Sequence, residues 1–149
     1  MDILESLFSK IVIPKFIIDY EMLKNGKQQR FQILQHKRSN PSSPFEVIDK
    51  DQNKTFKRIV SYEYAEMIKY IDPGEAECCG YAKALSIKII ISDNRRDFDE
   101  MEKRSFILLG HRELLTLSVL FSLLTVEDAA SIYNQINHER EWLEYIIGF

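Results

Sequence analysis

The sequence predicts a single α/β domain in which helices flank a central, mostly parallel sheet. Helical and strand-like segments alternate over residues 1–24 and again from residue 61 onward, which is typical of parallel sheets. A continuous apolar run at 88–92 indicates a strand covered on both faces. Residues 29–60 interrupt the alternation, and they predict an inserted antiparallel hairpin.

Length and composition agree with one globular domain spanning residues 1–149. The chain weighs 17.6 kDa, and 45% of its residues are hydrophobic and 29% charged, which argues against disorder. The longest apolar stretch, 114–124, is shorter than the roughly 20 residues that a membrane-spanning helix needs. The first residues lack the basic start of a signal peptide, so we expect a cytoplasmic protein without a membrane partner.

Elements in the first half follow from apolar spacing. We expect helices at 2–8 and 15–24, with a C-cap at Asn25-Gly26, and a short strand at 10–14 closed by Pro14. Further strands are expected at 29–35, 45–49 and 55–60, after a loop at 39–44 and around a hairpin turn at 50–54. In the 29–35 strand, Phe31, Ile33 and Leu34 would be buried.

The second half is more regular. Strands are expected at 88–92 and 106–110, a helix or a loop at 98–104, and helices at 61–70, 75–86, 111–121, 126–135 and 139–146. Thr125 is the expected N-cap of the 126–135 helix, with Asp128 at the capping-box position. The 75–86 helix would turn Ala76, Cys79, Ala82 and Leu85 inward. At the C-terminal end, Trp142, Tyr145 and Ile146 share a helical face and would dock on the core.

Several classes of chemistry are excluded. The two cysteines, Cys78 and Cys79, are adjacent, and neighbouring cysteines seldom form a disulfide. The three histidines are scattered, so no zinc-ligand spacing exists. The chain also has no Gly-x-Ser-x-Gly turn, no Walker loop and no Gly-x-Gly-x-x-Gly motif.

Charge is distributed unevenly along the chain. Residues 1–60 carry 11 basic and 7 acidic side chains, whereas residues 61–149 carry 9 basic and 16 acidic ones, which together give the net charge of −3. One stretch holds five basic residues and no acid: Lys24, Lys27, Arg30, Lys37 and Arg38. Such a patch is either an ordinary solvated surface or an RNA-binding site that holds a phosphate backbone.

Acidic residues gather at two points that an α/β fold brings together. Glu75 and Glu77 begin a helix after the Pro73-Gly74 turn, while Asp93 ends an apolar strand and Asp97 follows closely. Strand C-termini and helix N-termini meet at one edge of such a sheet, and oxygen ligands there suit Mg²⁺ or Mn²⁺. The alternative is that Glu75 only complements the helix dipole and that Asp93 belongs to an ordinary turn.

The residues around these acids resemble PIN-domain nucleases. The run Ile71-Asp72-Pro73-Gly74-Glu75-Ala76-Glu77, followed by Ala82, Ala84-Leu85 and then Ile89-Ile90-Ile91-Ser92-Asp93-Asn94, is similar to that family's helix start and acid-terminated strand. The stretch from Leu4 to Pro14 is similar to its early helix and strand, and Gly110 with the helix after it to a late strand-to-helix passage. The resemblance loosely covers residues 3–24 and 71–124.

The resemblance implies a Mg²⁺- or Mn²⁺-dependent ribonuclease, often the toxin of a toxin–antitoxin pair, and a homodimer. Glu75 and Asp93 would be the catalytic metal ligands, with Glu77 and Asp97 as further ligands. Another acid, Asp19 or Glu21, would come from the helix after Pro14.

One departure predicts a degenerate active site. The family begins with an apolar strand ending in Asp, and this sequence begins at the helix that follows; a truncated gene start would give the same sequence. The alternative function is therefore an inactive PIN-like module that binds a protein or RNA partner. A third interpretation is an unrelated α/β protein with a chance Gly-Glu-Ala-Glu match.

Overall fold

The computed structural model describes residues 3–24 and 28–137, with side chains described at 3–20 and 32–136. The chain divides into two compact units. One combines Met1–Ser9 with Leu109–Phe149, and the other is Lys10–Leu108. The prediction of a single PIN-like domain over residues 1–149 stays a prediction.

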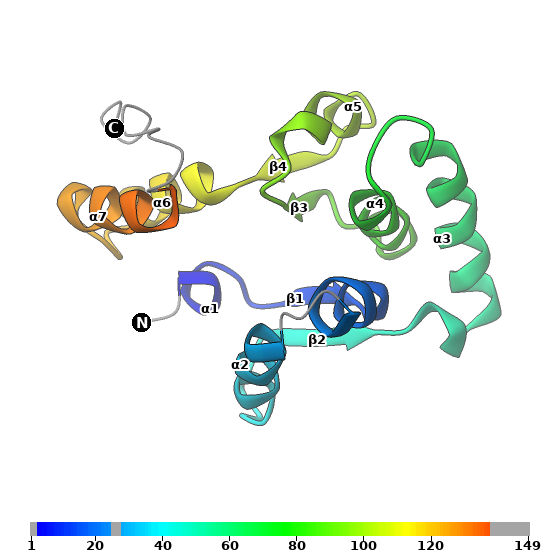
Figure 1. Cartoon of the computed structure of the whole chain (residues 1–149), viewed down its shortest axis with the longest axis horizontal. Helices are drawn as coiled ribbons and strands as arrows, with labels where there is room; N and C mark the ends of the chain where they lie inside the picture. The colour runs from blue at the N-terminus through cyan, green and yellow to red at the C-terminus, as the bar shows by residue number, and fades with distance from the viewer. Residues whose placement is uncertain (1–2, 25–27, 138–149) are drawn as a thin grey trace. The chain divides into compact units, whose positions relative to one another are not determined.

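The larger unit contains most of the secondary structure (Figure 1). Its strands are β1 (Ile11–Pro14), β2 (Phe45–Ile48), β3 (Ile89–Ile91) and β4 (Ile107–Leu109), the last ending at the unit boundary. Its helices are the π-helical η1 (Ile17–Lys24), α2 (Gln28–Arg38), the 3₁₀ turns η2 (Lys50–Gln52) and η3 (Arg95–Asp97), α3 (Lys54–Met67), α4 (Pro73–Leu85) and α5 (Phe98–Glu102). The expected mixture of helices and strands is confirmed.

The described strands form two pairs. β1 pairs with β2 in parallel, and Ile11 lies opposite Phe45. β3 pairs with β4, and the backbone N–H of Ile107 donates to the carbonyl of Lys88 at 2.8 Å. Because β2 pairs with β1 and is followed by η2 and α3, the predicted antiparallel hairpin at 45–60 is wrong.

Two predicted strands are helical. Residues 29–35 lie in α2, where Leu34 is buried but Ile33 is 51% exposed. Residues 55–60 lie in α3, which begins where the Asn53 side chain accepts a hydrogen bond from the Phe56 N–H at 2.9 Å. Apolar residues at helical spacing, Phe56, Val60 and Met67, explain why a helix forms there.

Helices α3 and α4 pack closely against each other. Gly80 makes the approach feasible, since a Cβ built on it would lie 2.7 Å from the Val60 carbonyl oxygen. α4 has Pro73 as its first residue and ends at Ser86 in the left-handed conformation (φ 55). As predicted, Ala76, Cys79 and Ala82 are buried, whereas Leu85 is only partly buried.

The main core joins these helices to β3 and β4. Met67, Ala76 and Cys79 contact Ile90, Leu108 and the α5 side chains Phe98 and Met101 in one cluster. The opposite face of the β3–β4 pair carries Ile89, Ile91 and Ile107, which are 41%, 37% and 52% exposed. The prediction that this strand is covered on both faces is therefore wrong.

The smaller unit is helical. It contains α1 (Ile3–Leu7), α6 (His111–Leu120) and α7 (Val126–Asn137). Leu115, Ala129 and Tyr133 form its buried cluster, with Ile3 of α1 against it. The predicted N-cap is confirmed, because the Asp128 N–H donates to Thr125 Oγ1 at 3.1 Å.

Some predictions fall outside the described residues. These are the C-cap at Asn25-Gly26, the helix at 139–146, and the docking of Trp142, Tyr145 and Ile146. Within the described part of the chain, no helix has the length and apolarity that crossing a membrane requires.

Candidate metal centre

Asp72 and Glu75 lie at the start of α4. The Asp72-Pro73-Gly74 turn begins this helix, and the Asp72 carbonyl accepts the first helical hydrogen bond, from Ala76 N–H at 2.9 Å. The Asp72 side chain does not cap the helix. Its Oδ2 instead accepts hydrogen bonds from Asn94 Nδ2 at 2.9 Å and Arg96 Nη2 at 2.6 Å. The carboxylate is thereby directed toward the segment that follows β3.

Asp97 comes from that segment and is 3% exposed. Its Oδ2 accepts from the Asp72 backbone N–H at 2.9 Å and from Asn94 Nδ2 at 3.0 Å. Its Oδ1 lies 3.7 Å from Arg96 Nε. These contacts tie the turn after β3 to the start of α4, as the closeness of strand and helix ends in α/β folds would lead one to expect.

Glu75 completes a cluster with Asp72 and Asp97. Each of the three offers a carboxylate oxygen, and these oxygens all lie within 4.8 Å of one another. Burial raises the pKa of Glu75, and the nearby Asp97 and Asp72 charges add to the rise, while a 2.9 Å hydrogen bond from Ser92 Oγ opposes it. A carboxyl group so placed would be held in its ionised form by a cation at the cluster.

The donor set fits Mg²⁺ or Mn²⁺, which prefer carboxylate oxygens. Two features work against a cation there. Arg96 already supplies a positive charge to Asp72, and the Asn94 amide donates to both Asp72 and Asp97. Arg96 is 72% exposed, however, so its side chain has room to move away from the cluster.

The six predicted metal ligands are distributed over several places. Glu75 and Asp97 are in the cluster. Asp93 is exposed and is not one of the three grouped carboxylates. Asp19 forms an i,i+4 ion pair with Lys15 at 3.2 Å, and the side chain of Glu21 lies outside the described residues.

Glu77 has a different environment from Glu75. It is 2% exposed, and its Oε1 lies 2.7 Å from Lys50 Nζ. The Lys50 backbone N–H also donates to the Tyr81 hydroxyl at 2.9 Å, and burial raises the pKa of Tyr81 to about 12. These contacts join η2 to α4. Glu77 lies on α4 two residues after Glu75, which belongs to the cluster.

Four residues of the site were not predicted as functional: Asp72, Ser92, Asn94 and Arg96. Asp72 enters the sequence analysis only within the run that resembles PIN domains, although an acid before Pro-Gly at a helix start is a usable signal. The other three follow an apolar strand, where polar side chains in α/β proteins gather at the sheet edge.

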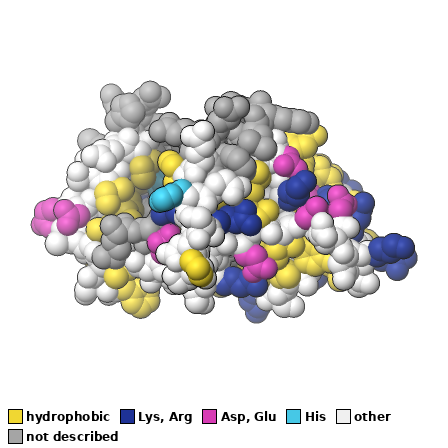
Figure 2. Space-filling model, turned by 90° about the horizontal axis from the view of Figure 1, so that it is seen from below, with side chains coloured by type: hydrophobic (Ala, Val, Ile, Leu, Met, Phe, Trp, Pro, Cys, Tyr) yellow, Lys and Arg dark blue, Asp and Glu magenta, His cyan; other side chains and the backbone are white. Residues whose placement is uncertain are grey.

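The predicted basic patch is only partly described. Lys37 and Arg38 lie in the last turn of α2, while the side chains of Lys24 and Arg30 and the whole of Lys27 are outside the description. Elsewhere in residues 1–60, Lys10 pairs with Glu46 and Lys57 with Asp51, both at 2.8 Å. Figure 2 shows a face on which basic side chains lie beside acidic ones.

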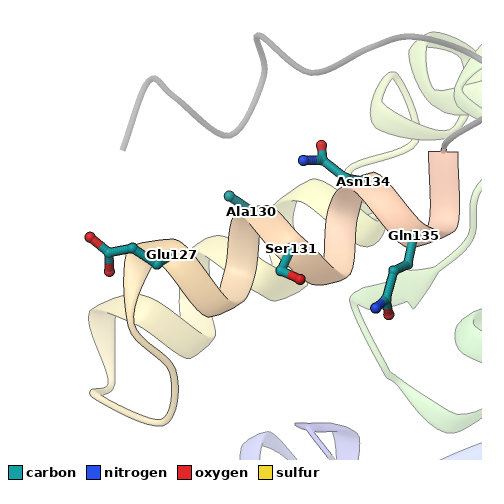
Figure 3. Close-up of a pocket in the computed structure, with 5 residues that line it drawn as sticks. All are labelled: Glu127, Ala130, Ser131, Asn134 and Gln135. Atoms are coloured by element: carbon teal, nitrogen blue, oxygen red, sulfur yellow. The ribbon is translucent and has the colours of Figure 1, made fainter.

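A hollow beside α7 carries none of this chemistry. The described residues that line it come from that one helix (Figure 3): Glu127, Ala130, Ser131, Asn134 and Gln135. Glu127 is the single carboxylate among these described residues, so they do not form a group of acids like that of Asp72, Glu75 and Asp97.

Comparison with known proteins finds no matching family model, no matching curated protein and no matching solved structure. The function must therefore be argued from the site and from the sequence resemblance.

Proposed function

We propose that the chain is a PIN-like protein whose Asp72, Glu75 and Asp97 hold a divalent cation, and that it hydrolyses RNA as a ribonuclease of the toxin type. The observation that carries the proposal is the convergence of three carboxylates from two separate segments, the start of α4 and the turn after β3. These are the segments on which the resemblance to PIN domains rests.

Residues of the chain would position the cation and the RNA phosphate for hydrolysis. A bound cation would polarise water and offset the charge of a phosphodiester. The carboxylates would position that cation, and Ser92 would orient Glu75 through its hydrogen bond. Arg96, once released from Asp72, would offer a guanidinium group to a phosphate oxygen.

Titration calorimetry with Mn²⁺, run beside an RNA cleavage assay, tests the proposal. We expect binding and cleavage in the unaltered chain and loss of both in Glu75→Gln. Asp93→Asn is the matched control, since Asp93 is exposed and outside the cluster. If Asp93→Asn abolished both activities while Glu75→Gln kept them, the assignment of Asp72, Glu75 and Asp97 would be wrong.

The second candidate is an inactive PIN-like module that binds a protein or RNA partner. The Arg96–Asp72 ion pair favours it, because an internal guanidinium already balances part of the charge that would attract a metal. This function is supported if millimolar Mn²⁺ gives no binding heat and no RNA is cleaved. Capture of labelled RNA by the same uncleaving protein would then separate an RNA partner from a protein partner.

A further inference from the structure

Helix α3 carries two exposed cations and an exposed aromatic ring on one face. Lys54, Arg58 and Tyr62 stand at i, i+4 and i+8 of this helix, so successive side chains lie about one turn apart. All three residues are exposed, and the exposed fraction of Tyr62 is 72%. We call these three residues the α3 stripe.

The stripe lies on the side of α3 that does not contact α4. The two helices meet where Val60 approaches Gly80 (Figure 1). Val60 and Met67 are 0% exposed, and at 3.6 residues per turn both stand about half a turn around the helix from Arg58. The stripe therefore takes no part in the packing that holds α3 in place.

The cations of the stripe have no counterion within the described part of the chain. The side chains of Lys54 and Arg58 form no ion pair and no hydrogen bond with a residue that the structure describes. The acid in the middle of α3, Glu63, is 6% exposed and lies 3.6 Å from Arg104 instead. Two like charges at i and i+4 lower the stability of a helix, and an external anion would offset that cost.

We propose that the α3 stripe binds single-stranded RNA, with backbone phosphates at Lys54 and Arg58 and a base stacked on the ring of Tyr62. The two cations by themselves would suit any polyanion. The exposed ring one turn beyond Arg58 favours a nucleic acid, because bases stack on aromatic side chains. Only unpaired bases are free to do so, since those of a duplex stack on one another.

This inference rests on the proposed ribonuclease for the choice of RNA, but binding at the stripe requires no cation. α3 ends at Met67, and residues 68–71 join it to Asp72 of the carboxylate cluster. A strand that continues along α3 beyond Tyr62 therefore runs toward the end of the helix from which Asp72 follows. Measuring RNA binding in EDTA and cleavage in Mn²⁺ lets the two proposals fail separately.

Fluorescence anisotropy of a labelled oligouridine, added to the full chain in EDTA, tests the stripe. A length of about 12 nucleotides falls within the range that single-strand-binding folds cover. We expect Tyr62→Ala to weaken binding about fivefold or more, which is the effect of losing one stacked base. Arg58→Gln and Lys54→Gln should each reduce the slope of log affinity against log salt by about 0.7, the value for one phosphate of a single strand.

Three control variants separate the stripe from general effects. Lys83→Gln removes an exposed cation of α4 and should leave the salt slope unchanged. Phe121→Ala removes a 66% exposed ring of the smaller unit and should leave the affinity unchanged. Glu75→Gln should bind the oligouridine as the unaltered chain does, because it alters only the carboxylate cluster. Circular dichroism checks that each variant keeps its helices.

Several outcomes would overturn the proposal. The first is the absence of oligouridine binding at low salt, and the second is unchanged binding in Tyr62→Ala and Arg58→Gln, which would place the RNA elsewhere on the chain. Equal affinity for duplex RNA or inorganic polyphosphate would show that the stripe responds to charge alone. Equal affinity for polyglutamate would instead assign it to an acidic protein partner.

Discussion

At the residue scale, the site depends on which acids the turns bring together. Asp97 and Asp72 are linked through the Asp72 backbone N–H and the Asn94 amide, and these contacts depend on how the turn after β3 bends. Spacing along the sequence marked Glu75, Asp93 and Asp97 as neighbours of a sheet edge. Spacing alone does not predict that Asp97 is buried while Asp93 is exposed. The 3₁₀ turn Arg95–Asp97 determines which of the two side chains is buried.

The raised pKa of Glu75 predicts a pH-dependent gain in stability for Glu75→Gln. Since burial disfavours the ionised form, the unaltered protein loses stability as the pH rises through the titration of Glu75 in the folded state. The neutral glutamine avoids this loss. We expect the two proteins to match below the ordinary value of 4.5 and the variant to have the larger free energy of unfolding at neutral pH.

Urea unfolding at several pH values, without divalent metal, measures the difference. Glu102→Gln is the control, since Glu102 is an exposed carboxylate outside the cluster. A variant whose stability relative to the unaltered protein falls as the pH rises would show that the ionised carboxylate is favoured in the folded protein. Added Mn²⁺ should reverse the order if the cluster binds the cation, because the ion stabilises the ionised glutamate.

The Lys50–Glu77 pair gives a second prediction at this scale. Removing the cation by Lys50→Met leaves a carboxylate that is 2% exposed without its 2.7 Å partner. Breaking a buried pair in this way costs about 3–5 kcal/mol, and we expect the lower end because the Lys50 side chain is 28% exposed.

Chemical denaturation of Lys50→Met, Glu77→Leu and the double variant measures the coupling. The double variant should be more stable than Lys50→Met, since the unpaired charge is gone. If the losses in free energy of unfolding of the two single variants added up to that of the double variant, the contact between Lys50 and Glu77 would contribute nothing to stability.

At the element scale, long periodic segments were predictable and short mixed ones were not. The helices of α4, α6 and α7 were expected within a few residues of their bounds, because apolar spacing and capping residues agree over more than two turns. Residues 55–60 were assigned to a strand from a six-residue window rich in β-branched side chains. Over the full span of α3, the period is helical and Asn53 provides the cap.

The α2 segment shows the same limitation. Phe31, Ile33 and Leu34 suggested a strand, yet neighbouring residues of a strand face opposite sides. The exposed Ile33 and buried Leu34 fit a helix whose buried face is narrow. Glutamines and arginines on both sides of these apolar residues favour a helix. A prediction from the short apolar window alone leaves out these flanking residues.

The contact between α3 and α4 predicts that Gly80→Ala is destabilising. Alanine is the better helix former by about 1 kcal/mol, but its Cβ would lie 2.7 Å from the Val60 carbonyl oxygen and 2.8 Å from Val60 Cγ1. Overpacking against backbone costs about 1–3 kcal/mol, so we expect a net loss and a lower melting temperature.

Thermal unfolding of Gly80→Ala beside Lys83→Ala tests this contact, because Lys83 lies on the exposed side of the same helix. Lys83→Ala should change stability by less than about 0.5 kcal/mol. Equal stability of Gly80→Ala and the unaltered protein would show that α3 and α4 separate easily.

At the scale of the whole molecule, the two units differ in how much apolar surface they bury. Among the described residues, the main cluster of the larger unit has ten buried members, and the cluster of the smaller unit has three. The α/β class followed from the alternation of patterns along the chain, but the division into units did not. It arises because residues 1–9 join residues beyond 108, a long-range contact that no local pattern encodes.

This difference predicts unequal protection of backbone amides from hydrogen exchange. Local opening requires less free energy where few apolar contacts must be broken. We therefore expect amides in the middle of α4, around Cys79 and Ala82, to exchange more slowly than those in the middle of α7, around Ala129 and Tyr133. Mass spectrometry of exchange at neutral pH measures both helices in one experiment.

A core substitution in each unit supplies the control. Met101→Ala should speed exchange in α4, and Leu115→Ala should speed exchange in α7, because each side chain belongs to the cluster that holds that helix. If either substitution accelerated both helices equally, the two units would unfold as one cooperative body. Slower exchange in α7 than in α4 would instead show that the smaller unit gains stability beyond the three residues of its described buried cluster.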